Sequence, residues 1–451
     1  MPAAWSDEGP VDLDVVVSVN GDGDAAVGDG LRLSPVISQF RVMTQFRGAR
    51  VVLPILFVTV FLDLVGFGII IPFLAYYVES FGARAAVVGL LMSSYSLAQF
   101  LFAPVWGRVS DRVGRRPILL LGLTGSVAGF TLFGLAGTLG LLFVGRVLMG
   151  IFGATIPTAQ AAVADVTAPQ DRARGMGLIG AAIGLGFILG PALGGVLSNL
   201  SSVLRLPLFE HNPYALPCLA SAALAAFNLI AAAFFLPESL PHDRRGSHSG
   251  EGFSRIAILS RGLTDRRLRL LVLVYFLFML GFTMMEATLT LFIERRIGAG
   301  DHAQLVRRVG YLFGFIGIIQ VGLQGGLVGR LARLFGERKL LIAGCAVTAL
   351  ALAALPFAAS WPGIYGCAFG LACGHGLSQP SVASLISRAA PPQTQGGALG
   401  ISQSAASLAR VLGPAMGGAL FEQIAPGAPY VVAAGLSIAA VVCAAPGRRD
   451  A

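Results

Sequence analysis

The chain contains little charge. Only 12% of its 451 residues are Asp, Glu, Lys or Arg, whereas 55% are hydrophobic and the mean hydropathy is +0.77. A soluble domain carries about twice that charged fraction, because its surface must stay hydrated. The composition therefore excludes an ordinary soluble protein and predicts an integral membrane protein.

Residues that bind metals or act as nucleophiles are also scarce. The five cysteines form no CxxC pair and have no histidines at the spacing of a metal site. No GxSxG, HExxH or paired-carboxylate motif is present, so an intramembrane enzyme is disfavoured and no cofactor or metal is expected. The net charge of +9 does not indicate nucleic acid, because the basic residues lie in short loops between apolar runs.

Apolar runs dominate the chain from residue 52 onward. Each is near the roughly 20 residues that a helix needs to cross the hydrocarbon core of a bilayer. These runs predict twelve transmembrane helices at 52–76, 87–106, 117–137, 139–164, 173–198, 214–236, 269–293, 309–329, 339–358, 362–387, 396–421 and 428–445.

Two motifs occur once in each half of the chain. The segment 107–117 (GRVSDRVGRRP) returns in degraded form at 329–339, and 190–195 (GPALGG) returns at 413–418. Internal duplication is typical of secondary transporters, which bind their substrate between two related halves. We predict a six-helix bundle at 51–236, a cytoplasmic linker at 237–268 and a second six-helix bundle at 269–446.

The first 50 residues are predicted to form a disordered cytoplasmic tail, because 1–31 are acidic and poor in large apolar side chains. Met43 directly precedes the first apolar run and is an alternative start, which would leave 1–42 untranslated. No cleavable signal peptide is expected. Most Lys and Arg fall in loops on one side, which predicts a bacterial inner membrane protein with both termini cytoplasmic. An arginine cluster between the seventh and eighth runs, at 295–308, violates this bias.

Several segments resemble signatures of the major facilitator superfamily, and the likeness extends over residues 52–445. The segment 186–195 is similar to a signature enriched in the family's antiporters. Segments 63–68 and 164–167 resemble the tetracycline/proton-antiporter branch of drug exporters. The other matching features are the turn 107–116 and Arg146 followed by Gly150 and Gly153.

This resemblance implies the major facilitator fold. That fold is an all-α integral membrane architecture in which twelve transmembrane helices form two pseudo-symmetric six-helix bundles. It also implies that the first, fourth, seventh and tenth spans line a central cavity.

The turn at 107–116 is a candidate conformational latch. Asp111 can pair with the neighbouring arginines or cap a helix of the other half near residue 396, and a contact made in only one conformer would bias the equilibrium between conformers. Asp165 is an expected partner of Arg112 or Arg115. The alternative is a purely positive-inside anchor. The candidate latch residues are Gly107, Asp111, Arg112, Gly114, Arg115, Arg116 and Asp165. In the second copy Arg333 replaces the aspartate, so any latch is expected on one side only.

Small residues in the fifth span form a candidate antiporter packing motif. Gly186, Gly190 and Gly194 recur every four residues and leave a groove along one helix face, beside Pro191 and Gly195. We expect this groove to pack against a helix of the opposite half and seal the outer side. A generic packing face is the alternative.

Charges inside apolar spans are the candidates for proton coupling, because each costs at least about 2.5–3.5 kcal/mol at the bilayer centre. Asp63 lies in the first span, Arg146 in the fourth and Glu286 in the seventh. We predict that Asp63 carries the proton, that Arg146 approaches it and tunes its protonation, and that Glu286 is a second carrier or cation contact. The alternative is a permanent structural ion pair.

Other polar residues in the spans are weaker candidates for the substrate cavity: Gln160, Gln320, His375, Gln379 and Arg410. Arg410 can pair with Glu286 or line the path. Interhelical hydrogen bonds would explain the glutamines equally well, and packing would explain His375.

These features predict a monomeric secondary transporter whose partners are protons, a small amphipathic molecule and the lipid bilayer. Proton-coupled efflux is the leading interpretation. The alternatives are a symporter that imports a nutrient and a sensor without transport. The runs 117–137 and 339–358 lack the deep carboxylates of the tetracycline-specific branch, which favours another organic substrate.

Overall fold

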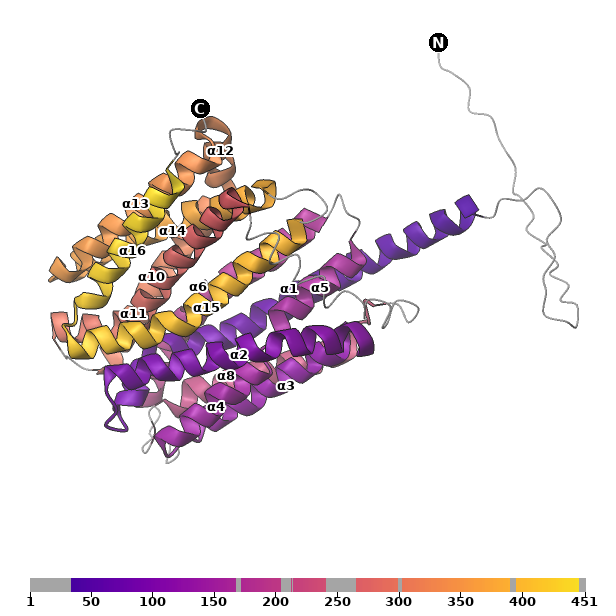
Figure 1. Cartoon of the computed structure of the whole chain (residues 1–451). Helices are drawn as coiled ribbons and strands as arrows, with labels where there is room; N and C mark the ends of the chain where they lie inside the picture. Colours follow the sequence, from indigo (N-terminus) through magenta and orange to yellow (C-terminus); the bar gives the residue numbers. More distant parts are fainter. Residues whose placement is uncertain are drawn as a thin grey trace, which may run out of the picture. The chain divides into compact units, whose positions relative to one another are not determined.

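The computed structural model describes residues 34–167, 172–203, 212, 214–240, 265–298, 302–389 and 395–445. Over these residues the chain is helical and has no strand (Figure 1). The chain divides into two units, Met1–Gln45 and Phe46–Ala451, and the helix packing lies in the second unit. Helix α1 begins at Ser34, inside the predicted tail. Met43, the alternative start, lies within α1, whereas the acidic segment 1–31 and linker residues 241–264 lie outside the described residues.

Each predicted span coincides with one helix or with consecutive helical segments. The first half contains α1 (Ser34–Glu79), α2 (Ala85–Val113), α3 (Arg115–Gly134), α4 (Leu139–Ile151), α5 (Thr155–Val166), α6 (Arg172–Val203) and α8 (Ala215–Phe235). The second half contains α10 (Arg266–Ile297), α11 (His302–Gly322), α12 (Val328–Phe335), α13 (Glu337–Ala354), α14 (Trp361–Ala389), α15 (Gln395–Gln423) and α16 (Ala428–Ala444). A π-helical turn, Leu323–Leu327, joins α11 to α12. In the described part of the chain, nine helical segments are long and apolar enough to cross a membrane, and α16 is a shorter apolar helix.

The predicted fourth span is not one continuous helix. It breaks after Ile151, and α5 starts at Thr155. Pro157 explains the break, because it lacks an N–H and its ring clashes with the carbonyl four residues earlier, at Gly153. Side chains of α2 bind the freed carbonyls: Trp106 donates to Ile151, and Gln99 donates to Gly153 over 2.9 Å.

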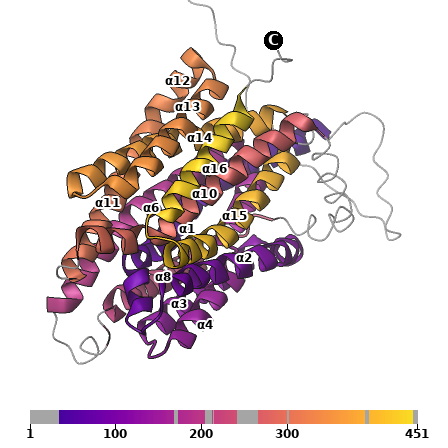
Figure 2. The same cartoon turned by 60° about the vertical axis from the view of Figure 1, so that its left-hand side comes forward.

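Two pairs of helices join the halves. Helix α2 packs along α15, and α6 packs along α11 (Figure 2). A Cβ on Gly89 would overlap the carbonyl of Pro414, so the backbones of α2 and α15 are in direct contact. The Ser93 hydroxyl accepts a hydrogen bond of 3.1 Å from the Ala415 backbone N–H. We call the end of the unit that holds Arg84, Glu422 and the C-terminus of α1 the sealed end.

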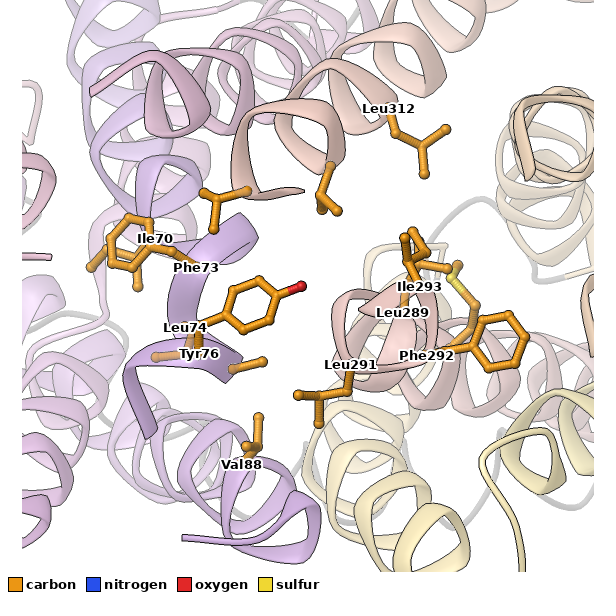
Figure 3. Packing of buried hydrophobic residues seen from close by; sticks show 14 of the residues in the cluster. Ile70, Phe73, Leu74, Tyr76, Val88, Leu289, Leu291, Phe292, Ile293 and Leu312 are labelled. Atoms are coloured by element: carbon orange, nitrogen blue, oxygen red, sulfur yellow. The ribbon is translucent and has the colours of Figure 1, made fainter. Parts of the chain in front are cut away.

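An apolar core fills the sealed end and includes residues from both halves. Tyr76 of α1 points toward α10, and Val88 of α2 and Leu291 of α10 both lie below its ring in the view of Figure 3. Its hydroxyl donates to the Thr290 carbonyl of α10 over 3.3 Å. Tyr76 is buried, so its ring is part of the packed core between α1 and α10 at this level.

The three glycines of the α6 motif that recur every four residues do not face the opposite half, which corrects part of the prediction. Gly186, Gly190 and Gly194 pack against α1 of their own half, where a Cβ on Gly190 would lie 2.7 Å from the Gly68 Cα. The contact with α11 comes from the adjacent face, because a Cβ on Gly195 would lie 3.2 Å from the Arg307 Cα and the Pro191 carbonyl meets Gly310. A repeat of four residues fixes one stripe of a helix but does not identify the helix that meets it.

Gly190→Val should destabilise the protein, because the added side chain would enter the α1 backbone. Overpacking of this kind costs about 1–3 kcal/mol or more. Gly180→Val is the matched control, since Gly180 lies on the same helix with nothing within 4 Å of an added Cβ. The measurement is the melting temperature of each purified variant in detergent. Equal melting temperatures would contradict the α1–α6 contact.

Candidate functional site

Asp63 lies half-buried on α1, within a membrane-spanning segment. Its Oδ1 accepts a hydrogen bond of 3.0 Å from the Ser126 hydroxyl of α3, and the Thr155 side chain at the start of α5 also hydrogen-bonds to it. The break between α4 and α5 brings Thr155 to this position. No ion pair to Asp63 is present among the described residues, so the carboxylate is held by neutral donors.

Arg146 makes no ion pair with Asp63 among the described residues, which counts against the alternative of a permanent structural ion pair, and the tuning of Asp63 by Arg146 stays a prediction. Arg146 lies on α4 with 2% of its surface exposed, and its guanidinium carbon is 5.5, 5.8 and 5.3 Å from the ring centres of Phe67, Tyr95 and Phe133. Phe67 lies one helical turn beyond Asp63 on α1, so the guanidinium is directed one turn away from the carboxylate. Cation–π contacts stabilise a cation in such a site. Within the described part of the chain its Nε has no hydrogen-bond partner.

Glu286 and Arg410 form the matching part of the site in the second half. Both are half-buried, Glu286 on α10 and Arg410 on α15. Glu286 lies within electrostatic range of Arg410 and Arg146, although neither guanidinium makes an ion pair with it among the described residues. Arg410 donates a hydrogen bond of 3.2 Å to the Ser407 hydroxyl.

Tyr95 of α2 connects the two parts. Its hydroxyl is in the field of Asp63, Arg146 and Arg410 together. Asp63, Tyr95, Arg146, Glu286 and Arg410 therefore form one central polar cluster with contributions from both halves. Sequence periodicity could not assemble this set, because the members come from five different helices.

His375 lies beside this cluster, on α14. It is buried and its ring stacks on Phe278 and Phe282, with centroids 5.3 and 4.3 Å away. Gln379 hydrogen-bonds both His375 and Tyr275. Gln160 on α5 and Gln320 on α11 are half-buried, and the structure shows no contact that joins either to the central polar cluster.

The candidate latch is organised around Arg115 at the start of α3. Its Nε donates to Asp165 over 2.8 Å, while one terminal nitrogen donates to Asp111 and, over 2.7 Å, to Ser110. Asp111 is therefore engaged with its own half. Arg112 is exposed, and Gly107 lines a cavity of 130 Å³ together with Asp111, Arg115 and Pro157.

Glu238 completes the latch and was not predicted. It follows α8, and its two carboxylate oxygens accept the backbone N–H groups of Arg115 and Arg116 over 2.8 and 3.3 Å. This is a helix N-cap supplied by a residue far along the chain. Gly114 has φ +113°, and a Cβ there would collide with the Glu238 carboxylate. The only sequence signal was an acid at the start of the linker, and its carboxylate also accepts the Leu240 backbone N–H over 3.0 Å.

The second copy of the turn repeats this arrangement with the charges exchanged. Glu337 at the start of α13 pairs with Arg388 at the end of α14 over 3.2 Å, as Arg115 pairs with Asp165. Arg116 donates to the Ala233 carbonyl, and Arg338 donates to that of Ala444 over 2.8 Å. The expected one-sidedness concerned the aspartate position, where Arg333 donates to the Gly329 carbonyl over 3.4 Å, and it stays a prediction. The ion pair of Glu337 is a separate feature that both copies share with the signs exchanged.

Two of the unexplained arginines at 295–308 contact aromatic rings at the sealed end. The guanidinium of Arg295 lies 4.8 Å from the Phe421 ring centre, and that of Arg308 lies 5.4 Å from the Trp361 ring centre. Stacking on an aromatic face gives these cations a local structural role.

Two related helical halves with a polar cluster between them define a polytopic secondary transporter. The sequence model of the Major Facilitator Superfamily matches residues 56–333 and 306–450. The chain therefore belongs to this family. Class C tetracycline resistance protein of Escherichia coli is 32% identical over 401 residues, which cover 87% of this chain and 95% of that protein. Multidrug resistance protein 2 of Bacillus subtilis (strain 168) is 28% identical, over 82% of this chain and 88% of that protein.

Solved structures show the same fold. The human organic anion transporter MFSD10 (TETRAN) is 26% identical with a TM-score of 0.66, over 88% of this chain and 99% of that one. The nucleoside transporter NupG has a TM-score of 0.69 at 14% identity, over 87% and 98% of the two chains. The predicted all-α major facilitator fold is confirmed.

Glu238→Ala should lower the stability of the first half, because two backbone N–H groups at the start of α3 lose their acceptor. Loss of an N-cap costs about 0.5–2 kcal/mol. Glu238→Gln keeps one acceptor oxygen and should cost less. The measurement is the melting temperature of the purified variants. Equal melting temperatures for Glu238→Gln and Glu238→Ala would contradict capping by two oxygens.

Proposed function

We propose that this protein exports a small amphipathic organic compound from the cytoplasm in exchange for protons. It would work as a monomer without a cofactor, in the inner membrane of a bacterium with both termini cytoplasmic. Relatives named for tetracycline and multidrug resistance support the direction of transport. The antiporter signature in α6 supports it as well.

The observation that carries the proposal is the environment of Asp63. A permanently charged carboxylate in a bilayer needs a cation partner to offset its cost, which is at least about 2.5 kcal/mol. Asp63 has hydroxyl donors instead of an ion pair among the described residues. A hydroxyl can donate to the charged carboxylate or accept from the protonated one. The site therefore suits a group that gains and loses a proton.

The neighbouring cations link this proton to the substrate. Arg146, Arg410 and Asp63 all interact electrostatically with Tyr95, and both arginines interact electrostatically with Glu286. A change of charge on Asp63 or Glu286 alters the field that an ionised substrate would meet. Substrate and proton can then compete for the cluster, which is the requirement for exchange.

Aromatic surfaces on both sides of the cluster suit a ligand with a planar apolar part. Phe67 and Tyr95 lie on the first half, with ring centroids 5.3 Å apart. Phe278 and Phe282 lie on the second half and stack on His375. Such a wall with a few polar groups is typical of small-molecule sites. We infer an organic substrate that carries both a ring system and an ionisable group.

The sealed end supports an alternating-access mechanism, in which one end of the protein is closed while the other is open. The halves are joined there by the apolar core around Tyr76 and by the α2–α15 and α6–α11 contacts. Substrate would enter the central polar cluster from the opposite end, which holds the latch. Rocking of the halves about the cluster would then exchange which end is sealed.

Asp63→Asn should abolish proton-driven transport while leaving substrate exchange. In everted vesicles, substrate added to the parent protein should dissipate a preformed proton gradient, and this response should fall at least about tenfold in the variant, as expected when an essential titrating group is removed. Exchange of labelled substrate between equal pools should persist, because it needs no net proton movement. A panel of tetracycline and other amphipathic drugs provides the substrates.

Asp63→Glu and Ser126→Ala are the controls. The first retains a titratable group and should keep measurable coupling, and the second removes one hydrogen bond but not the acid. Full coupling in Asp63→Asn would remove Asp63 from the role of carrier. Uptake driven by an inward proton gradient would instead identify a symporter.

A further inference from the structure

We infer that Glu422 is a conformational latch of the sealed end, a positioning residue that acts through α2 and holds the two halves together there. The inference rests on the alternating-access transport proposed above. Glu422 lies one residue before the end of α15, and its partners lie at the start of α2 in the other half. No sequence motif singled it out.

The contact is an N-cap supplied across the interface. The Glu422 Oε2 accepts the backbone N–H of Ala86 over 3.1 Å. Ala86 is the second residue of α2, whose own N-cap residue, Arg84, makes no side-chain cap. The first N–H groups of a helix need an acceptor and carry partial positive charge, so a carboxylate there is stabilising. Helix α2 therefore receives its cap from the opposite half.

Arg84 adds a second interaction to the same carboxylate. Its guanidinium donates to the other oxygen of Glu422 over 3.3 Å. The Arg84 side chain is 83% exposed, whereas that of Glu422 is 24% exposed. Exposed ion pairs contribute little because water screens them. The backbone cap should therefore be the stronger of the two interactions.

Close backbone packing allows the carboxylate to reach this position. Gly418 lies one turn before Glu422, and a Cβ on it would lie 2.5 Å from the Ala85 carbonyl oxygen and 3.0 Å from the Ala86 Cα. Gly89 and Pro414 make the next contact along the same pair of helices. Both contacts must separate if the halves part at the sealed end, and the cap must break with them.

The antiparallel arrangement of α2 and α15 makes this latch the counterpart of Asp111. Ala86 at the start of α2 meets Glu422, whereas Gly89 and Ser93 further along α2 meet Pro414 and Ala415. The two helices are therefore antiparallel, and the C-terminus of each lies toward the N-terminus of the other. Asp111 occupies the last turn of α2 as Glu422 occupies that of α15. In this structure Glu422 is engaged across the interface, whereas Asp111 pairs with Arg115 in its own half.

The two acids are separated by the length of α2, about 38 Å at 1.5 Å per residue. If α2 and α15 tilt relative to each other as rigid rods, separation at one end brings them together at the other. Rocking that releases Glu422 from α2 would thus bring Asp111 toward the start of α15. The inference assigns Glu422 to the conformer seen here and predicts its release in the other.

The test measures how often the sealed end opens. Ser93 is 7% exposed between α2 and α15, so a cysteine at this position reports separation of the pair. In Ser93→Cys protein, Glu422→Ala should raise the rate of alkylation by a membrane-impermeant maleimide, added at the sealed end, by about tenfold, which corresponds to loss of a charged cap. Gln423→Ala is the matched control and should leave the rate unchanged, because Gln423 is the exposed neighbour on the same helix.

Two further variants separate the contribution of the backbone cap from that of the Arg84 ion pair. Glu422→Gln keeps an oxygen for Ala86 and should give a smaller increase, and Arg84→Gln should change the rate less than twofold, as expected for an exposed ion pair. If Glu422→Ala does not accumulate in the membrane, Glu422→Gln decides the question. If Glu422→Ala, or Glu422→Gln in its place, is labelled at the control rate, the inference is overturned. A parallel rise at the buried native Cys218 and Cys345 would also overturn it, because it would indicate unfolding.

Labelling and proton coupling are independent measurements. A latch phenotype in a protein without proton coupling would leave Glu422 assigned and refute the proposed function. Normal coupling in a protein whose labelling is insensitive to Glu422 would refute the latch alone.

Discussion

The contact of the two halves at the sealed end is the constraint on which the rest of the structure depends. Small residues bring the backbones of α2 and α15 together at Gly89 and Pro414, and those of α6 and α11 at Gly195 and Gly310. The apolar core around Tyr76 contains residues of both halves. In the transport proposed above, a closed sealed end requires that substrate and protons reach the central polar cluster from the other end. This packing therefore sets the side from which the proposed proton and substrate sites would be reached.

The polar cluster itself illustrates how a membrane protein carries charge within the bilayer. Arg146 is surrounded by three aromatic rings, and Asp63 is held by hydroxyl groups of α3 and α5. Neither arrangement cancels a charge by direct pairing. The energetic cost is instead spread over cation–π contacts, hydrogen bonds and the field of the opposite charges. Such a site responds strongly when one member changes its protonation.

Duplication preserved geometry more faithfully than it preserved residues. The ion pair Arg115–Asp165 joins α3 to α5, and its counterpart Glu337–Arg388 joins α13 to α14 with the acid and the base exchanged. Gly114 and Gly336 both have positive φ at the turn before the following helix. The attraction between two unlike charges does not depend on which helix carries which sign. A search for identical residues therefore misses this conserved interaction.

Composition and apolar run length determined by themselves that this is a helical membrane protein, since backbone groups in lipid must be satisfied within each segment. The repeated turn and the charged residues within apolar runs, Asp63, Arg146 and Glu286, could be identified for the same local reasons. Only the tertiary structure decided that Arg146 faces rings rather than Asp63, that the α6 glycines meet α1, and that Glu238 and Glu422 cap helices remote in sequence. Each of these depends on which helix faces which, and on side-chain direction within one residue. Neither is encoded in a local hydrophobic period.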